Sequence, residues 1–220
     1  YEADLTYVHS VNVALIASIL GQWLKFSEKD IRILTISGLL HDIGKIMIPN
    51  EILTKPGKLT VAEYNIMKQH VNFGYEKVKN QNIDIRIKEA CLLHHEKCDG
   101  TGYPFGLKSD HIPAVAKIIA IADVYDAMTS ARVYRGALCP FEVIDTMYKD
   151  AFTKFEPEYI LPFLKNVASS YINNDVRLSD GRIGKVVLIN ENALSLPIVQ
   201  CEDEFIDLSK TRGLTVSAIL

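Results

Sequence analysis

Apolar residues recur at helical spacing through most of the chain. Over residues 5–24 they fall three or four positions apart, which places them on one face of an α-helix. A second helix, capped by Ser27 or Asp30, carries the pattern as far as His41-Asp42. Gly44 follows where such a helix would end. The chain is therefore expected to begin with two amphipathic helices.

Proline, glycine and capping residues divide the rest of this helical region. Two prolines and a glycine predict a loop over residues 46–58. Thr60 and Glu63 have the form of a capping box, which starts a helix towards His70. Gly74 is expected to interrupt the stretch that follows. Later helices are expected over residues 85–96, from Pro113 past Asp123, and from Pro140 and Pro157 to about residue 171.

The pattern changes after about residue 174. Two apolar runs, residues 176–178 and 183–189, flank a Ser-Asp-Gly-Arg turn at residues 179–182, which is a hairpin signal. Two further short strands are expected over residues 198–200 and 205–208. We therefore expect a mainly α protein, with a helical domain over residues 1–174 and a small β-rich appendage over residues 175–220.

Composition limits the binding partners and the cellular compartment that we expect for the protein. The 220 residues are 48% hydrophobic and 23% charged, which is typical of a globular protein with one sizeable core. A net charge of −3 gives no basic footprint for long nucleic acid. The four cysteines lack CxxC spacing and no apolar run has transmembrane length, so we expect the cytoplasm and no membrane contact. The chain starts at Tyr1 instead of a methionine, and the helical pattern is present by Leu5, so we expect a piece excised from a longer protein.

Histidines and aspartates carry the candidate chemistry. Five of the six histidines fall on or at the ends of expected helices. These are His9, His41, His70, His94 and His95. A single helical histidine is more often a hydrogen-bonded or surface group. The pairs His41-Asp42 and His94-His95, with Asp123 in an apolar run, favour metal binding instead, because a buried carboxylate must be paired or metal-bound. These nitrogen and oxygen donors suit Fe, Mn, Co or Zn without choosing among them.

The number of candidate ligands is enough for more than one ion. Asp42 is the natural bridge, because a carboxylate has two oxygens whereas an imidazole offers one lone pair. Two metals about 3.5–4 Å apart would turn a shared water into a hydroxide near neutral pH and hold the attacking and leaving oxygens of a phosphoryl displacement. Hydrolysis of a phosphate ester is therefore the expected reaction.

The ordered motifs resemble those of the HD-GYP family, a branch of the HD superfamily. They are His9, His41-Asp42-x-Gly44-Lys45, His70, His94-His95-Glu96-x-x-Asp99-Gly100-x-Gly102-Tyr103-Pro104 and Asp123-x-x-Asp126-Ala127. The resemblance covers residues 5–171. It implies a helical bundle with two or three metals, often iron or manganese. It also implies hydrolysis of cyclic di-GMP to the linear dinucleotide pGpG, or on to GMP.

The resemblance assigns metal ligands and catalytic residues by motif position. The implied ligands are His9, His41, Asp42, His70, His94, His95 and Asp123. Lys45 resembles the family lysine beside the scissile phosphate, where a cation could stabilise charge or protonate the leaving oxygen. Its alternative role is a cation favoured at a helix C-terminus. Leu5 stands where members with a third metal carry glutamate, so we expect two metals.

Substrate contacts are implied at two further places. The Gly102-Tyr103-Pro104 loop would bind substrate, with Tyr103 offering a flat face to a guanine. Arg132 and Arg135 match the stretch that grips the phosphates, and a solvated turn is the alternative. Helix capping or loop hydrogen bonds would explain Asp99 and Asp126, which match the motif without being implied ligands.

Two other functions stay open. One is an HD phosphohydrolase that acts on another nucleotide, such as a cyclic mononucleotide or a guanosine polyphosphate. Tyr103 and the two arginines argue against it. The other is a non-catalytic receptor or interaction module, which would have no need for an intact ligand set. A homodimer and an N-terminal sensory or receiver domain outside this segment are also left open.

Overall fold

The helices build most of the structure, a computed structural model that describes residues 2–130 and 138–220. Two long helices come first, α1 (Glu2–Trp23) and α2 (Glu28–Leu40). The Ser27 side chain caps α2 by accepting a hydrogen bond from the Asp30 amide at 3.2 Å. The other helices are η1 (Ile43–Met47), α3 (Asn50–Leu53), α4 (Val61–Met67), α5 (His70–Val78), α6 (Ile85–Leu93), η2 (Ser109–His111), α7 (Ala114–Thr129), α8 (Pro140–Asp150) and α9 (Pro157–Ser170).

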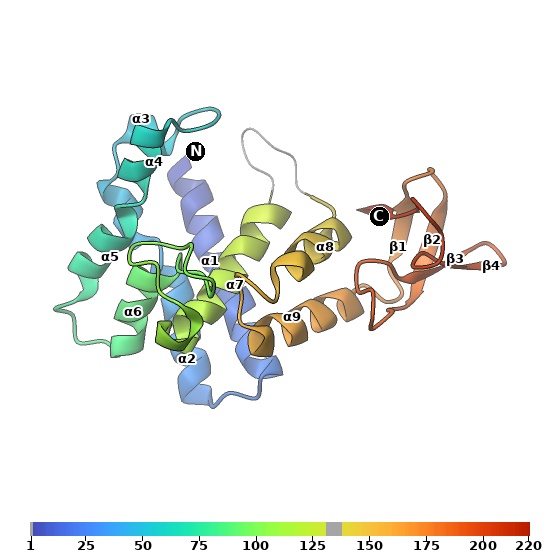
Figure 1. Ribbon diagram of the computed structural model, residues 1–220, viewed down its shortest axis with the longest axis horizontal. Helices are drawn as coiled ribbons and strands as arrows, with labels where there is room; N and C mark the ends of the chain where they lie inside the picture. Colours follow the sequence, from blue (N-terminus) through green and yellow to red (C-terminus); the bar gives the residue numbers. More distant parts are fainter. Residues whose placement is uncertain (1, 131–137) are drawn as a thin grey trace.

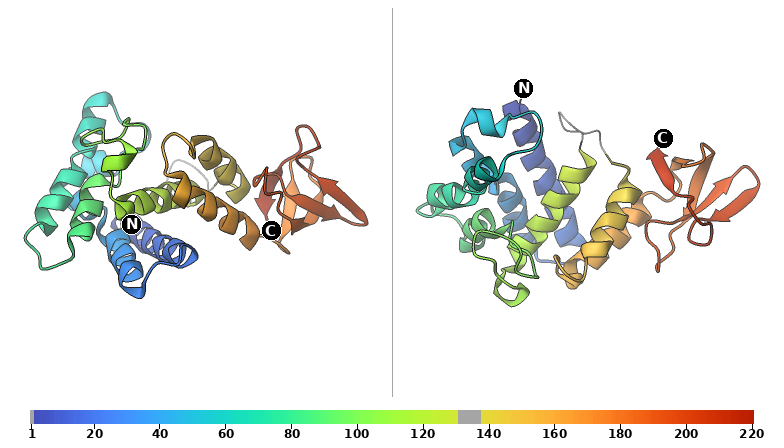
Figure 2. Two further views of the ribbon diagram at one scale, coloured as in Figure 1. Left: turned by 60° about the horizontal axis from the view of Figure 1, so that its bottom comes forward. Right: turned by 45° about the horizontal axis from the view of Figure 1, so that its top comes forward.

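A small antiparallel sheet follows the helices. Its strands are β1 (Asp175–Leu178), β2 (Ile183–Leu188), β3 (Ile198–Cys201), β4 (Glu204–Asp207) and β5 (Val216–Ile219), in the order β4-β3-β2-β1-β5. In Figures 1 and 2 the sheet lies at one end of the molecule, beyond α8 and α9. Buried side chains continue from the helices into it, from Phe163 on α9 to Val176 and Val199. The expected mainly α fold with a C-terminal β appendage is confirmed. The division into two domains remains a prediction.

The core of the helical part lies between α1, α2 and α7. Leu20, Leu34 and Ile118 are completely buried there. The helices α1 and α7 also carry histidine or aspartate on the side that approaches the ends of α2 and α6. Burial of their apolar faces therefore fixes the positions of the polar side chains described below.

Several expected boundaries differ from the observed ones. The expected loop over residues 46–58 contains the end of η1 and the short helix α3. Gly74 lies inside α5 instead of interrupting it, and the backbone of Gly44 packs against the helix at this point. The helix expected to reach Glu96 ends at Leu93. The strand β5 was not expected, since its pairing with the distant β1 leaves little local signal.

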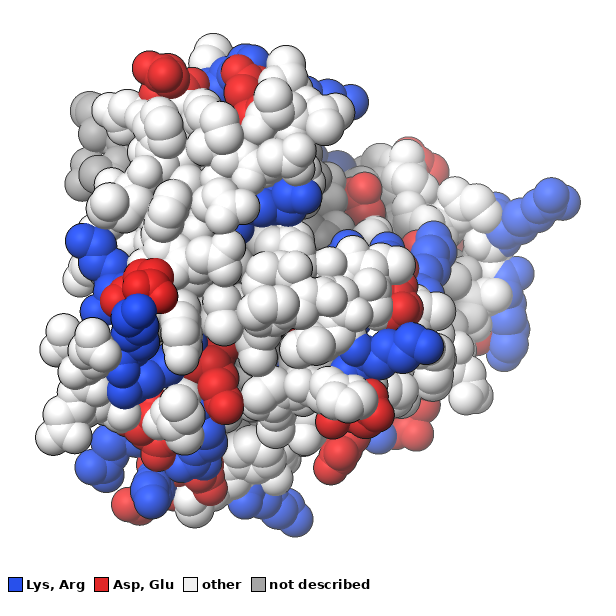
Figure 3. Space-filling model, turned by 60° about the vertical axis from the view of Figure 1, so that its left-hand side comes forward, with Lys and Arg blue, Asp and Glu red and all other residues white. Residues whose placement is uncertain are grey.

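Charged side chains of both signs share the surface. On the face shown in Figure 3, lysine and arginine side chains are interspersed with aspartate and glutamate, and uncharged residues lie between them. None of the helices in residues 2–130 and 138–220 is long and apolar enough to cross a membrane.

Candidate metal centre

All seven predicted ligand side chains lie together where five segments of the chain meet. His9 comes from α1 and Asp123 from α7, while the others lie at helix ends. His41 and Asp42 directly follow α2, His70 begins α5, and His94 and His95 follow α6. Helix packing has thus brought residues more than a hundred positions apart into one cluster.

Asp42 lies between two groups of histidines. Its Oδ1 atom is 3.3 Å from Nε2 of His70 and 3.9 Å from Nε2 of His94. Its Oδ2 atom is 3.3 Å from Nε2 of His41 and 3.7 Å from Nε2 of His9. Each group, with Asp42, keeps its ligand atoms within 4.8 Å of one another, and His95 belongs with His70 and His94. One carboxylate therefore faces two potential metal positions.

Asp123 also lies beside both groups. Its Oδ1 atom is 3.0 Å from Nε2 of His9 and 4.0 Å from Nε2 of His41. Its Oδ2 atom is 3.9 Å from Nδ1 of His95. The second carboxylate thus completes the cluster on the α7 side.

Backbone carbonyls set the tautomer of three of the histidines. The Nδ1–carbonyl oxygen distances are 2.7 Å for His41 and Gly38, 2.8 Å for His70 and Met67, and 2.9 Å for His94 and Ala90. Because a carbonyl can only accept, Nδ1 carries the proton and Nε2 keeps its lone pair. The Nε2 atoms of His70 and His94 are only 3.4 Å apart, so two lone pairs face each other. Such pre-oriented Nε2 atoms are typical of metal ligands.

Two buried atoms of the cluster have no hydrogen-bond partner among the described residues. They are Nε2 of His41 and Oδ1 of Asp42, whose side chains are almost completely buried. Leaving such atoms unpaired costs about 1–3 kcal/mol each. Cations placed between the carboxylate and the imidazoles would satisfy both atoms. The residues therefore fit divalent metal ions, and the nitrogen and oxygen donors suit transition metals.

The protonation states also suit a metal centre. Burial lowers the pKa of His95 to about 4 and lowers that of His94 well below its usual range. Burial raises the pKa of Asp42, but the Lys45 ammonium together with His41 and His70 outweighs burial and holds that pKa well below its usual range. Near neutral pH the imidazoles of His94 and His95 are therefore neutral and the Asp42 carboxylate is charged, which are the forms that bind metal.

Asp126 holds His9 in place. Its Oδ2 atom lies 2.6 Å from Nδ1 of His9, and Asn12 and Ser130 both donate to its Oδ1 atom at 2.9 Å. Burial lowers the pKa of His9, but hydrogen bonds to Asp123 and Asp126 outweigh it and raise the pKa to about 9. The sequence reasoning gave Asp126 no part in this cluster. The signal that could have found it is its position three residues after Asp123, on the same helix face.

Lys45 lies directly beside the cluster. Its ammonium is 2.5 Å from Oδ2 of Asp42, and its side chain is 25% exposed. Asp42 is 2% exposed by the same measure. The lysine therefore lies at the solvent side of a buried carboxylate.

The Gly102-Tyr103-Pro104 loop is held against the cluster. The Tyr103 ring stacks on the His95 ring, with centroids 4.7 Å apart and an interplanar angle of 30°. A Cβ atom on Gly102 would come within 2.5 Å of the backbone of His95 and Glu96, so this glycine is required for packing. Pro104 is joined to Tyr103 by a cis peptide bond and is half-buried.

Glu96 anchors this loop, a role that the sequence reasoning missed. Its side chain is buried and accepts hydrogen bonds from the amides of Phe105 at 2.7 Å and Leu107 at 2.9 Å. Its position directly after His95 in the motif was the available signal. Asp99, in contrast, accepts hydrogen bonds from Thr101 within the loop, as expected.

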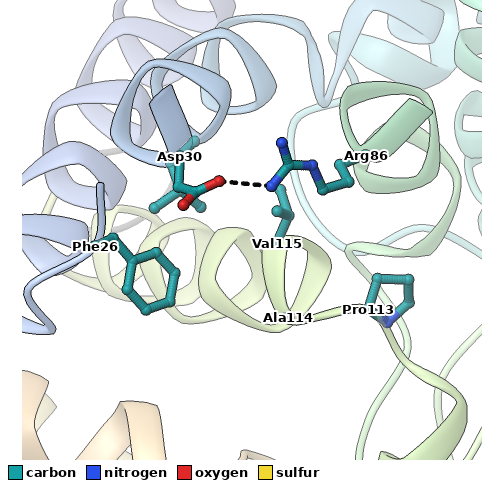
Figure 4. Close-up of a pocket in the computed structure, with 7 residues that line it drawn as sticks. Phe26, Asp30, Arg86, Pro113, Ala114 and Val115 are labelled. Carbon is teal, nitrogen blue, oxygen red and sulfur yellow. Dashed lines mark hydrogen bonds and ion pairs between the residues drawn. The ribbon is translucent and has the colours of Figure 1, made fainter. Parts of the chain in front are cut away.

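Some residues lie outside this arrangement. Arg132 and Arg135 fall outside the described residues, so their predicted contacts with phosphate remain predictions. His111 is exposed and contacts Asp110 instead of the cluster. An open cavity of about 250 Å³ lies elsewhere, where Arg86 reaches Asp30 at 2.7 Å (Figure 4). It contains none of the predicted site residues, so the cluster is the stronger candidate site.

The sequence is similar to known proteins over most of its length. The sequence matches the HD domain family over residues 3–159. It is 37% identical over 198 residues to a cyclic di-GMP phosphodiesterase of Pseudomonas aeruginosa, covering 90% of this chain and 48% of that protein. It is 39% identical over 149 residues to the 3'3'-cGAMP-specific phosphodiesterase 1 of Vibrio cholerae, covering 66% of this chain and 34% of that protein. The chain thus spans less than half the length of either relative.

A solved structure shows the same fold. The HDG"Y"P protein from Bdellovibrio bacteriovorus aligns with a TM-score of 0.60 at 23% identity, covering 71% of this chain and 50% of that one. At this identity the similarity concerns the fold alone. The sequence match covers most of the chain, and the resemblance inferred from the motifs is confirmed. The chain therefore belongs to the HD domain family.

Proposed function

We propose that this chain is a metal-dependent phosphodiesterase that hydrolyses cyclic di-GMP to pGpG or GMP. The observation that carries the proposal is the position of Asp42, whose two oxygens face two separate groups of histidines. Membership in the HD domain family and the name of the Pseudomonas relative support a phosphodiester as the substrate. Together they favour hydrolysis over binding alone.

Two iron or manganese ions are the proposed cofactors. His9, His41 and Asp42 would hold one, and His70, His94, His95 and Asp42 would hold the other, with Asp123 beside both. When bound, such ions supply Lewis acidity to a phosphodiester and activate water near neutral pH. The position one helical turn before His9 is Leu5 instead of a carboxylate, which supports two ions over three.

Residues around the cluster would position and stabilise the substrate. Lys45, next to the buried Asp42, can place its ammonium against charge that develops on the phosphate or donate a proton to the leaving oxygen. One face of the Tyr103 ring stacks on His95 and so helps to orient this proposed metal-binding side chain. We therefore assign Tyr103 a positioning role first, with contact to a base as its second role. Gly102 and Pro104 would support this loop, and Arg132 and Arg135 remain proposed phosphate contacts.

A product assay tests the function. Protein purified without oxygen and loaded with iron or manganese is incubated with cyclic di-GMP, and the nucleotides are separated by chromatography. We expect pGpG or GMP to accumulate, and chelation of the metal to stop the reaction. Tight binding without any cleavage after long incubation would favour a receptor instead.

A second candidate substrate is 3'3'-cGAMP, because one relative carries that specificity in its name. Hydrolysis rates separate the alternatives when they are measured on a panel of this dinucleotide, cyclic di-GMP, a cyclic mononucleotide and a guanosine polyphosphate. Faster hydrolysis of any other nucleotide than of cyclic di-GMP would refute our assignment. A cytoplasmic location, a homodimer and an N-terminal sensory domain remain predictions.

A further inference from the structure

Tyr64 of α4 and Lys68, which directly follows that helix, lie next to the loop that covers the cluster. The Lys68 ammonium is 5.3 Å from the ring centroid of Tyr64 and 6.0 Å from that of Tyr103. The two tyrosine rings meet edge to face, with centroids 6.5 Å apart and an angle of 82°. Such contacts hold a cation over aromatic rings without neutralising its charge.

This lysine is one aromatic ring away from the proposed metal ligands. Tyr103 has two other ring contacts, the stack on His95 and an edge-to-face contact with His70, whose ring centroid is 6.4 Å away at an angle of 82°. Tyr103 therefore separates Lys68 from two histidines of the cluster. Tyr64 is 49% exposed, so solvent reaches the tyrosine pair beside Lys68.

The charge of Lys68 is not compensated within the described part of the chain. In that part, no carboxylate lies within ion-pair distance of the Lys68 ammonium, and the ammonium donates no hydrogen bond. Lys45 differs, because it contacts Asp42, and Lys55 is paired with Glu63 at 2.7 Å. Lys68 is half-buried, so an ammonium without a carboxylate partner in the described residues lies beside the Tyr103 ring.

A cyclic dinucleotide has two phosphodiester groups, of which one can lie at the metals at a time. The ring of the substrate must carry its second phosphate outward from the cluster. An ammonium binds phosphate as a point charge. Lys68 offers such a charge beside the Tyr103 loop, where an extended ligand would leave the cluster.

We propose that Lys68 binds the second, uncleaved phosphate of a cyclic dinucleotide, with Tyr64 and Tyr103 positioning its ammonium. The inference rests on the proposed function for the identity of the substrate. It makes Lys68 a determinant of specificity for ligands with two phosphates over ligands with one.

The test compares Lys68→Gln with Lys68→Arg and with the control Lys77→Gln, which removes the same charge from an exposed position on α5. Each metal-loaded variant is assayed with cyclic di-GMP and with bis(p-nitrophenyl) phosphate, a diester that has one phosphate. We expect Lys68→Gln to raise KM for cyclic di-GMP about tenfold, as for loss of one charged hydrogen bond. Its metal content, its kcat and its hydrolysis of the single-phosphate diester should stay unchanged, as should all values for Lys77→Gln. Lys68→Arg should restore most of the affinity.

Two results would overturn the inference. One is an unchanged KM for cyclic di-GMP in Lys68→Gln, and the other is an equal rise in KM for the single-phosphate diester. If the wild-type protein leaves cyclic di-GMP uncut, the proposed function fails and the dissociation constants of the same variants are measured by calorimetry. A weaker constant for Lys68→Gln alone then supports the phosphate contact, whereas equal constants or no binding to any variant refute it.

Discussion

Two glycines on either side of one contact should respond to alanine in opposite ways. Gly44 in η1 packs against α5, and a Cβ atom there would lie 1.9 Å from the His70 carbonyl oxygen and 2.4 Å from the Gly74 nitrogen. Both neighbours are backbone atoms, so no side chain can move aside. The two segments would have to separate by more than about 1 Å to restore van der Waals contact. We expect Gly44→Ala to lower the free energy of unfolding by about 3 kcal/mol or more.

The same movement would disturb the cluster. η1 directly follows Asp42, and α5 begins at His70, whose Nε2 atom is 3.3 Å from Oδ1 of Asp42. Separation of the two segments therefore lengthens this distance. Gly44→Ala should weaken metal binding as well as folding.

Gly74→Ala is the matched control. Its added Cβ atom would lie 3.4 Å from the Gly44 nitrogen and 3.6 Å from a methyl group of Ile43, at or near ordinary contact distances. Alanine also gains up to about 1 kcal/mol over glycine inside a helix. We expect this variant to be neutral or slightly stabilised in urea denaturation with chelator present. Wild-type stability in Gly44→Ala, or equal losses in both variants, would refute the reasoning.

Two further substitutions test contacts around and away from the cluster. Asp126→Ala leaves Nδ1 of His9 without its acceptor, so metal affinity should fall about 10–100-fold in a chelator competition, and unchanged affinity would count against this role. Hydrogen bonds from Lys117 and Ser109 lower the pKa of Glu156 below its ordinary value of 4.5. The charged Glu156 side chain therefore stabilises the folded state above pH 4.5, and this contribution is lost as the pH falls through the lowered pKa. Urea denaturation should show Glu156→Gln less stable than wild type near neutral pH, with the difference vanishing in acid; a difference that grows in acid would contradict this.

Local signals were enough to predict most of the helices. The Ser27 cap, the Thr60-Glu63 capping box and the first-turn prolines Pro140 and Pro157 all act within a few residues, and the structure has helices at each. Gly74 was misassigned because its contact with Gly44 depends on the packing of two segments.

The candidate ligands were also visible in the sequence, but their surroundings were not. Adjacent pairs of metal-binding residue types marked His41-Asp42 and His94-His95. Asp99 and Asp126 gave equal signals in the sequence, yet Asp99 stays within its loop and Asp126 reaches His9 on another helix. Lys68 gave no signal, because its contact with the Tyr103 ring joins residues 35 positions apart. Such contacts depend on tertiary structure, which residue type and spacing do not encode.

Metal counting on Asp42→Ala tests the central claim most directly. Wild-type protein and variant are reconstituted without oxygen, dialysed and analysed for iron and manganese, with circular dichroism as the check on folding. Because Asp42 faces both groups of histidines, we predict two ions per wild-type chain and the loss of both in the folded variant. Full metal content in Asp42→Ala would contradict a shared carboxylate at the centre of the site.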